Sequence, residues 1–138
     1  MKLANALIYR IILNPTMHTP GAIERGLQPF AFIECEPTQQ VSAGWVPPRG
    51  KEHGPLLETV NGQWIARLKT ESRSVPGAAI KREVELRAAK IEEMTGRKPG
   101  RKEKKEMKED VLLALLPHAF PKQSCVNVWI DPKAGLLV

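Results

Sequence analysis

Residues 76–120 constrain the fold most, because their pattern predicts two consecutive charged helices. Apolar residues recur at steps of three and four, which is the spacing of one face of an α-helix. They are Ile80, Val84, Ala88, Ile91 and Met94 in the first half, and Met107, Val111, Leu112 and Leu115 in the second. Pro76 suits a first helical position, Gly96 a left-handed helix end, and Pro117 a stop. The sequence therefore predicts a helix pair joined at residues 98–100.

The flanking sequence predicts short β-strands. Residues 5–13 are rich in β-branched and large apolar side chains, and residues 125–130 alternate apolar with polar. Within residues 57–67, Asn61-Gly62 is the favoured pair for a two-residue hairpin turn, since both positions need positive φ. Residues 136–138 are expected to begin a strand that returns along 125–130.

Three further segments complete the expected elements. Residues 20–27 predict a short helix, and residues 30–33 predict a short strand. Residues 44–50 carry two adjacent prolines, which cannot lie inside a central strand, so an edge strand or a loop is expected there.

Together these elements predict an α+β fold. An antiparallel sheet would be built from the N-terminal strands, the hairpin and the C-terminal strands, with a protruding pair of charged helices. The chain has 138 residues and is 42% hydrophobic, which suffices for a buried core. The expected division is a β-rich core domain of residues 1–73 with 122–138, and a helical arm of residues 74–121.

Positive charge is concentrated around the start of the second helix. The net charge is +6, and residues 97–108 hold seven bases against two acids, which favours an anionic partner. Nine bases are predicted to contact nucleic-acid phosphates, where they would displace condensed counterions. They are Lys81, Arg82, Arg97, Lys98, Arg101, Lys102, Lys104, Lys105 and Lys108.

The alternative for this segment is a solvated helix surface held by i,i+4 ion pairs such as Lys102–Glu106 and Lys105–Glu109. No Asn or Gln lies among the bases, so contact with the phosphate backbone is expected rather than reading of base edges. No aromatic residue interleaves with them either, which argues against a platform for stacking single strands in this segment.

The sequence contains no clear catalytic or metal-binding motif. No catalytic residue, metal site or cofactor is therefore predicted. His18, His53 and His118 each lack a second ligand at metal-binding spacing. Gly-rich phosphate loops and the G-x-S-x-G motif are absent from the sequence. Cys35 and Cys125 are expected to be reduced thiols of a cytosolic protein. No apolar run approaches the roughly 18 residues of a membrane span.

Residues 116–121 offer two interpretations. Phe120 either fills the domain core or is an exposed aromatic anchor for another subunit, since aromatic residues concentrate at interface centres. The residues alone favour the core.

Several short sequence strings occur in the same order and at nearly the same spacing as in one known protein family. They are Tyr9-Arg10, Gly44-Trp45-Val46-Pro47-Pro48, Asn61-Gly62-Gln63, Pro76 with Ile80-Lys81, Val111-Leu112, Leu115-Leu116-Pro117, Ala119-Phe120 and Trp129-Ile130-Asp131. These strings resemble RdgC, a family of bacterial recombination-associated proteins. The resemblance covers the whole chain, which corresponds to the N-terminal part of a full-length member, less than half of it.

The resemblance implies a nucleoid-associated protein that forms ring-shaped homodimers around double-stranded DNA with little sequence preference. It implies a link to RecA, whose strand exchange the family restrains, and to replication-fork repair. It also places Leu116, Pro117 and Phe120 near a dimer contact that closes the ring. Residues 97–105 are a variable part of the pattern, and the chain is expected to be a truncated copy.

The predicted function is therefore non-sequence-specific binding of double-stranded DNA in recombination, without enzymatic activity, cofactor or membrane. The expected partners are duplex DNA and a second copy of the chain. One alternative is a dimerisation module without DNA affinity. The other is a metal-dependent exonuclease, a label sometimes attached to the family that the residues here do not support.

Overall fold

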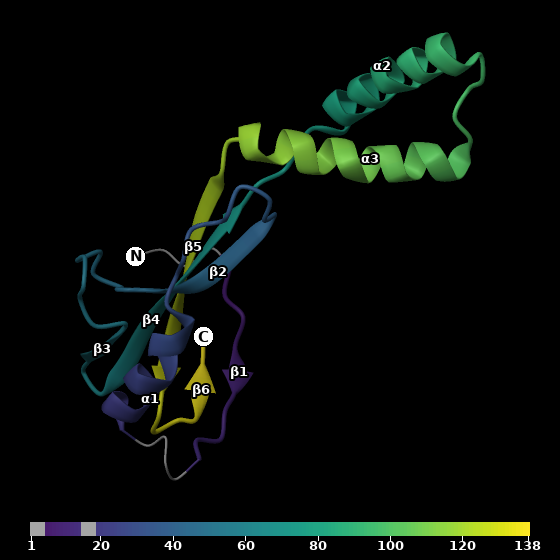
Figure 1. The fold of residues 1–138 in the computed structure, drawn as a ribbon. Helices are drawn as coiled ribbons and strands as arrows, with labels where there is room; N and C mark the ends of the chain where they lie inside the picture. Colours follow the sequence, from purple (N-terminus) through teal and green to yellow (C-terminus); the bar gives the residue numbers. More distant parts are fainter. Residues whose placement is uncertain (1–4, 15–18) are drawn as a thin grey trace. The chain divides into compact units, whose positions relative to one another are not determined.

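The computed structural model describes residues 5–14 and 19–138, and the chain forms two compact units. The sheet unit comprises Met1–Glu34, Ser42–Thr70 and Gln123–Val138, and the helical unit comprises Cys35–Val41 and Glu71–Lys122. Figure 1 shows the elements along the chain. His18, one of the three histidines of the chain, lies outside the described residues.

The predicted α+β class with an antiparallel sheet is confirmed. The strands are β1 (Tyr9–Arg10), β2 (Val41–Val46), β3 (Leu57–Val60), β4 (Gln63–Ser72), β5 (Lys122–Asp131) and β6 (Leu136–Leu137). Their order is β1-β6-β5-β4-β2, and β3 pairs with β4. The helices are α1 (Pro20–Leu27), α2 (Gly77–Thr95) and α3 (Arg101–Leu115), with 3-10 turns at Gln28–Phe30 and Leu116–His118. No helix in the described ranges combines the length and the apolar character that crossing a membrane requires.

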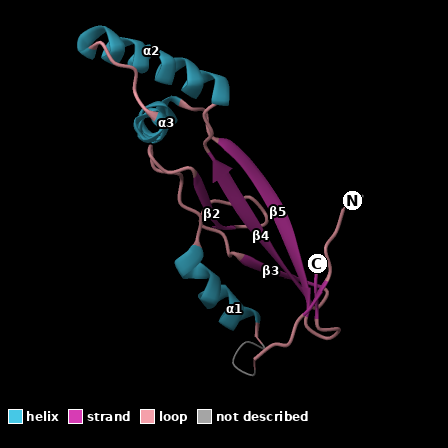
Figure 2. Cartoon of the chain, turned by 90° about the vertical axis from the view of Figure 1, so that its right-hand side faces the viewer, coloured by secondary structure: helices cyan, strands magenta, loops and turns pink. Residues whose placement is uncertain are grey.

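The core of the sheet unit lies between α1 and one face of the sheet (Figure 2). Ile23 of α1 packs there with Trp64 and Ala66 of β4, which are two residues apart and so share a face. Ile130 of β5 joins them, as its predicted alternation requires. Thr19 caps α1 through its hydroxyl, which accepts a hydrogen bond from the Ala22 N–H at 3.2 Å.

The hairpin turn predicted at Asn61-Gly62 is confirmed. Asn61 has φ 50° and Gly62 has φ 78°, and Val60 pairs with Gln63 directly across the turn. Both central residues therefore have the positive φ that a type I′ turn needs. The strand that follows, β4, runs to Ser72.

Two strand predictions near the N-terminus are wrong in extent or in kind. The strand expected over residues 5–13 is only Tyr9–Arg10, because its partner β6 offers two residues and the Ile11 N–H bonds instead to the Gly135 carbonyl at 2.8 Å. The strand expected over residues 30–33 does not form. Its first residue belongs to a 3-10 turn that contains Pro29, and Ala31 makes a single parallel bridge to Trp45.

The helical unit has its own core, formed where α2 packs against α3. Val84, Met107 and Val111 are buried there, as the predicted apolar spacing requires. Pro76 is the residue before the helix, with φ −55° and ψ 135°, rather than its first helical residue. Gly96 ends α2 at φ 72°, the left-handed helix end that was predicted.

The predicted apolar stripe of α2 is only partly covered. Met94 is 86% exposed and Ile91 is 37% exposed. The facing helix supplies no large apolar residue before Met107, because residues 101–106 of α3 are all charged. The last turns of α2 therefore have nothing apolar to pack against.

A short segment of the helical unit is joined to the end of β4 by buried polar contacts. Glu71 is 3% exposed, and its carboxylate accepts a hydrogen bond from the Cys35 N–H at 3.3 Å. Cys35 in turn donates from Sγ to the Glu71 carbonyl at 3.3 Å. Both Cys35 and Cys125 are free thiols, as predicted.

Candidate nucleic-acid interface

The predicted phosphate-contacting residues lie on a helical hairpin. Residues 96–100 form a short connection, and α2 and α3 run back along each other within the helical unit (Figure 1). Their apolar faces meet at Val84, Met107 and Val111, so the charged faces of both helices remain on the outside. All nine predicted bases have exposed side chains.

Four of these bases form one continuous stripe on α3. Positions i, i+3, i+4 and i+7 lie on one face of a helix with 3.6 residues per turn. The bases at this spacing are Arg101, Lys104, Lys105 and Lys108, here called the basic stripe. Seven residues at a rise of 1.5 Å make the stripe roughly 10 Å long. It therefore presents four cations within a short distance along one helix.

Three of the four acids of α3 are gathered on a different face, while the fourth, Glu109, lies one turn after Lys105. Glu103, Glu106 and Asp110 are spaced i, i+3 and i+7, and together with Arg87 and Lys90 of α2 they line a groove between the two helices. The acidic face thus lies beside bases of the partner helix. This segregation of charge leaves the basic stripe with few acids on its own face.

The ion pairs expected to neutralise the basic segment do not form. Neither Lys102–Glu106 nor Lys105–Glu109 is an ion pair within residues 5–14 and 19–138. Both have the base N-terminal to the acid, which is the less favourable orientation at i,i+4.

The helical unit instead contains two other ion pairs. Glu83 precedes Arg87 by four residues, and Arg87 Nε lies 3.3 Å from Glu83 Oε1. Arg97 Nη2 lies 3.2 Å from Glu103 Oε1. Among the nine predicted bases, only Arg97 is in an ion pair in the described part of the chain. The basic stripe therefore carries unpaired positive charge.

The remaining predicted bases are spread out. Lys81 and Arg82 lie near the start of α2, and the residues from there to the end of the helix span roughly 20 Å at 1.5 Å per residue. Lys98 lies in the connection between the helices, and Lys102 lies outside the spacing of the basic stripe. The structure therefore brings together four of the predicted bases and leaves the others apart.

The three residues predicted for a dimer contact have different environments. Leu116 is fully buried, while the Pro117 carbonyl accepts a hydrogen bond from Arg73 Nη1 at 3.3 Å. Phe120 is 93% exposed, so the interpretation in which it fills the core is wrong. Of the three, Phe120 has the side chain available for contact with another molecule.

Side chains that could ligate a metal ion are scattered over the described part of the chain. No group of three or more His, Cys, Asp or Glu side chains is arranged there to hold a metal ion. His53 and His118 are both exposed.

Sequence reasoning found the bases but missed their separation from the acids. The signal was present in the spacing, since the bases at 101, 104, 105 and 108 and the acids at 103, 106 and 110 follow two different helical faces. The contribution of Arg87 and Lys90 needed the structure, because they meet the acidic face only through helix packing.

Comparisons with a family model and with curated proteins point to the same family. A family model described as "Putative exonuclease, RdgC" matches residues 1–138. The curated relatives include proteins named recombination-associated protein RdgC. One from Herminiimonas arsenicoxydans is 44% identical over 97% of this chain, and one from Janthinobacterium sp. (strain Marseille) is 40% identical over 97%. Another, from Salmonella paratyphi B, is 34% identical over 97%.

A helical hairpin with an exposed basic stripe, joined to an antiparallel sheet, defines an α+β protein with a candidate surface for an anionic polymer. The chain belongs to the RdgC family. It spans 44% of the length of these relatives, less than half.

Proposed function

We propose that the chain binds double-stranded DNA without sequence preference through the basic stripe of α3, and that it acts in DNA recombination. The observation that carries the proposal is the exposed row formed by Arg101, Lys104, Lys105 and Lys108, which have no ion-pair partner among the described residues. Unpaired cations in a row suit a polyanion, because each one that meets a phosphate releases condensed counterions.

Duplex DNA suits this surface better than a small anion does. The stripe is linear and roughly 10 Å long, whereas a pocket for a single anion would gather donors around a point. Residues 101–108 contain no Asn or Gln to pair with adenine edges, which supports backbone contact without sequence preference. The recombination role rests on the names of the curated relatives.

The proposal predicts a specific salt dependence. Duplex DNA of random sequence, labelled with a fluorophore, is titrated with the chain at several salt concentrations in the presence of a chelator. Four phosphate contacts should give a log–log slope of about −3 to −4. Intact DNA is expected throughout, and its degradation on addition of Mg²⁺ or Mn²⁺ would favour the exonuclease alternative. A slope near zero would contradict a phosphate-binding stripe.

The proposal extends to a homodimer that closes through Phe120. A 93% exposed phenylalanine is costly in water and is typical of an interface anchor. A ring around DNA, association with the nucleoid and restraint of RecA are part of the same proposal, and they rest on the family of the chain.

Replacement of Phe120 by Ala should weaken self-association of the chain about 30-fold, the effect of a typical interface anchor. Sedimentation equilibrium measures the dimer dissociation constant. Met94→Ala is the matched control, since Met94 is a second large apolar side chain of the helical unit and is 86% exposed. Equal effects of the two substitutions would argue against a specific contact at Phe120.

A further inference from the structure

A groove runs along the helical unit between α2 and α3. Its volume is about 470 Å³, and one face of each helix lines it. The lining residues are Arg87, Lys90 and Ile91 of α2, and Glu103, Glu106, Met107 and Asp110 of α3. Seven residues at a rise of 1.5 Å make the lining face of α3 roughly 10 Å long. The groove therefore extends over about two helical turns.

The apolar lining of the groove is incompletely covered. Met107 belongs to the core of the helical unit, whereas Ile91 is 37% exposed. Met94 lies one turn after Lys90 and Ile91 on the same face of α2 and is 86% exposed. The facing part of α3 cannot cover these side chains, because residues 101–106 are all charged. An apolar face that the helices of the chain leave open is typical of a surface for a partner.

Opposite charges line the two sides of the groove, with acids along α3 and bases along α2. Arg87 and Glu103 are each held in an ion pair with a residue outside the groove, at 3.3 Å and 3.2 Å. The lining charges that have no ion-pair partner within residues 5–14 and 19–138 are Glu106, Asp110 and Lys90. Two free acids on one side and one free base on the other therefore flank the apolar residues.

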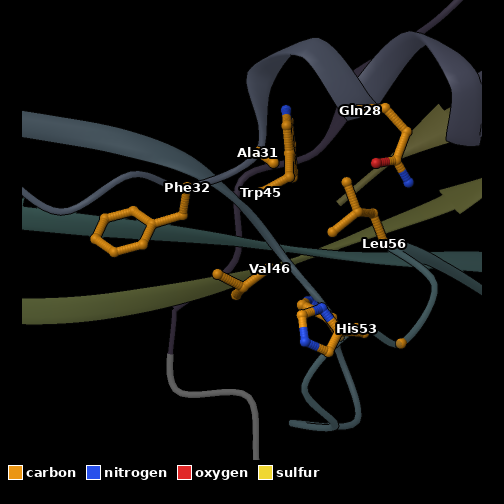
Figure 3. Close-up of a pocket in the computed structure, with 9 residues that line it drawn as sticks. Gln28, Ala31, Phe32, Trp45, Val46, His53 and Leu56 are labelled. Carbon is orange, nitrogen blue, oxygen red and sulfur yellow. The ribbon is translucent and has the colours of Figure 1, made fainter.

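The pocket of the sheet unit differs in chemistry from this groove (Figure 3). Gln28, Trp45 and His53 are among the side chains that line it, and the lining residues include no Lys, Arg, Asp or Glu. Fixed charge thus selects no occupant there. In the groove of the helical unit, by contrast, apolar and charged residues together specify one.

The shape of the groove fits a helix. Two helices packed side by side leave a furrow that a third helix can fill, at interaxial distances of about 8–10 Å. Nucleic acid does not suit it, because Glu106 and Asp110 repel phosphates. A second copy of the helical unit does not suit it either. Two concave grooves cannot fill each other, and the basic stripe has no apolar side chain to place against Ile91.

We propose that the groove between α2 and α3 binds an amphipathic helix of another protein, one whose apolar stripe is flanked on one side by Lys or Arg. The stripe covers Ile91 and Met94, and the flanking bases meet Glu106 and Asp110. An acid on the other flank meets Lys90, as charges flank the apolar seam of a coiled coil. The site goes beyond duplex binding and does not use the basic stripe.

Two labelled model peptides test the charge requirement. Both are amphipathic helices of about four turns with a leucine stripe and Glu on one flank, and the other flank carries Lys in one peptide and Gln in the other. The intact chain is titrated into each while fluorescence anisotropy is recorded. The Lys peptide should bind about fivefold more tightly, although the net charge of +6 opposes it. Equal affinities, or tighter binding of the Gln peptide, would overturn the proposal.

The acids of the groove can be removed without changing its shape. Glu106→Gln with Asp110→Asn should weaken binding of the Lys peptide about fivefold and leave binding of the Gln peptide unchanged. The matched control is Glu92→Gln with Glu109→Gln, which removes two exposed acids that do not line the groove. It should leave both affinities nearly unchanged. Equal losses in the two variants would show that net charge, not the groove, attracts the peptide.

A second pair of variants tests the apolar lining. Ile91→Gln should weaken binding of both peptides about tenfold, because each peptide loses an apolar contact. Leu86→Gln is the matched control, since Leu86 is 53% exposed on α2 and does not line the groove. Circular dichroism checks that both chains keep their helix content. Unchanged binding to the Ile91→Gln chain would place the peptide elsewhere and overturn the proposal.

Sedimentation equilibrium of the Glu106→Gln, Asp110→Asn chain tests the remaining occupant. An altered dimer dissociation constant would assign the groove to a contact between copies of this chain, against the proposal. Duplex binding should persist in this chain, because the basic stripe is intact. Conversely, a chain that fails to bind duplex DNA but still binds the Lys peptide would contradict the proposed function and support this site.

Discussion

Replacement of all four bases of the basic stripe by Ala should weaken binding to duplex DNA about 10³-fold at 0.1 M salt. The reason is that four phosphates would no longer meet a cation, and four such cations together contribute a log–log slope of about −3 to −4. The substituted residues are Arg101, Lys104, Lys105 and Lys108. The affinity should fall alike for every DNA sequence, and the salt dependence should flatten. Fluorescence titration across a salt series measures both quantities.

The helical hairpin should remain folded in this variant. All four side chains are exposed, none belongs to the core of the helical unit, and Ala has the highest helix propensity. Far-ultraviolet circular dichroism checks the helix content. A loss of DNA binding with unchanged helix content would therefore be caused by the missing charge.

A second variant matches the number of charges removed. Four other exposed bases of the helical unit are replaced by Ala: Lys81, Arg82, Lys90 and Lys98. If net charge alone drove binding, both variants would lose affinity equally. We expect this control to lose much less, because its bases are not gathered on one helix face. Equal losses would remove the basic stripe from its proposed role.

The helical hairpin was the most predictable part of the fold. Its pattern of apolar residues at steps of three and four was long, and Gly96 and Pro117 marked its ends, so local sequence determined both helices. Asn61-Gly62 was equally informative, since few residue pairs adopt positive φ at two successive positions. In these segments local preference and the final structure agree.

The wrong predictions concern strand length and burial, which depend on contacts with segments far away in the sequence. Residues 5–13 have strand-forming composition, yet only Tyr9–Arg10 pair because β6 offers two residues to them. Phe120 lies in an apolar string but is exposed, which periodicity could not show. Pairing length and burial depend on contacts between segments far apart in sequence, and these were not readable from the chain itself.

The residues of the candidate nucleic-acid interface could be predicted from the sequence, but their arrangement in space could be predicted only in part. Charge counting identified the basic segment, and helical spacing alone separates its bases from Glu103, Glu106 and Asp110. The approach of the segment after α1 to β2 was not predictable, since it depends on a single bridge between Ala31 and Trp45, which are far apart in local pattern. That approach depends on Gly44, which leads to a direct test.

Substitution of Gly44 by Ala should destabilise the sheet unit by about 3 kcal/mol. The added Cβ would lie 2.4 Å from Phe32 Cα and 2.6 Å from Phe32 N, and backbone atoms cannot rotate aside as the end of a flexible side chain can. Overpacking of a tight contact typically costs about 1–3 kcal/mol, and the upper end is expected here because the obstruction is main chain. Urea unfolding followed by tryptophan fluorescence measures the change, since all three tryptophans, Trp45, Trp64 and Trp129, belong to the sheet unit.

Gly77→Ala provides the matched control, because a Cβ on Gly77 meets no atom within 4 Å and the residue begins α2. It should leave the sheet unit unchanged, and it should stabilise the helix slightly through the higher helix propensity of Ala. A Gly44→Ala chain with unaltered unfolding would show that residues 31–33 do not pack against β2 as described. If the variant stays folded, duplex binding by the basic stripe should persist, because the stripe belongs to the helical unit and Gly44 to the sheet unit.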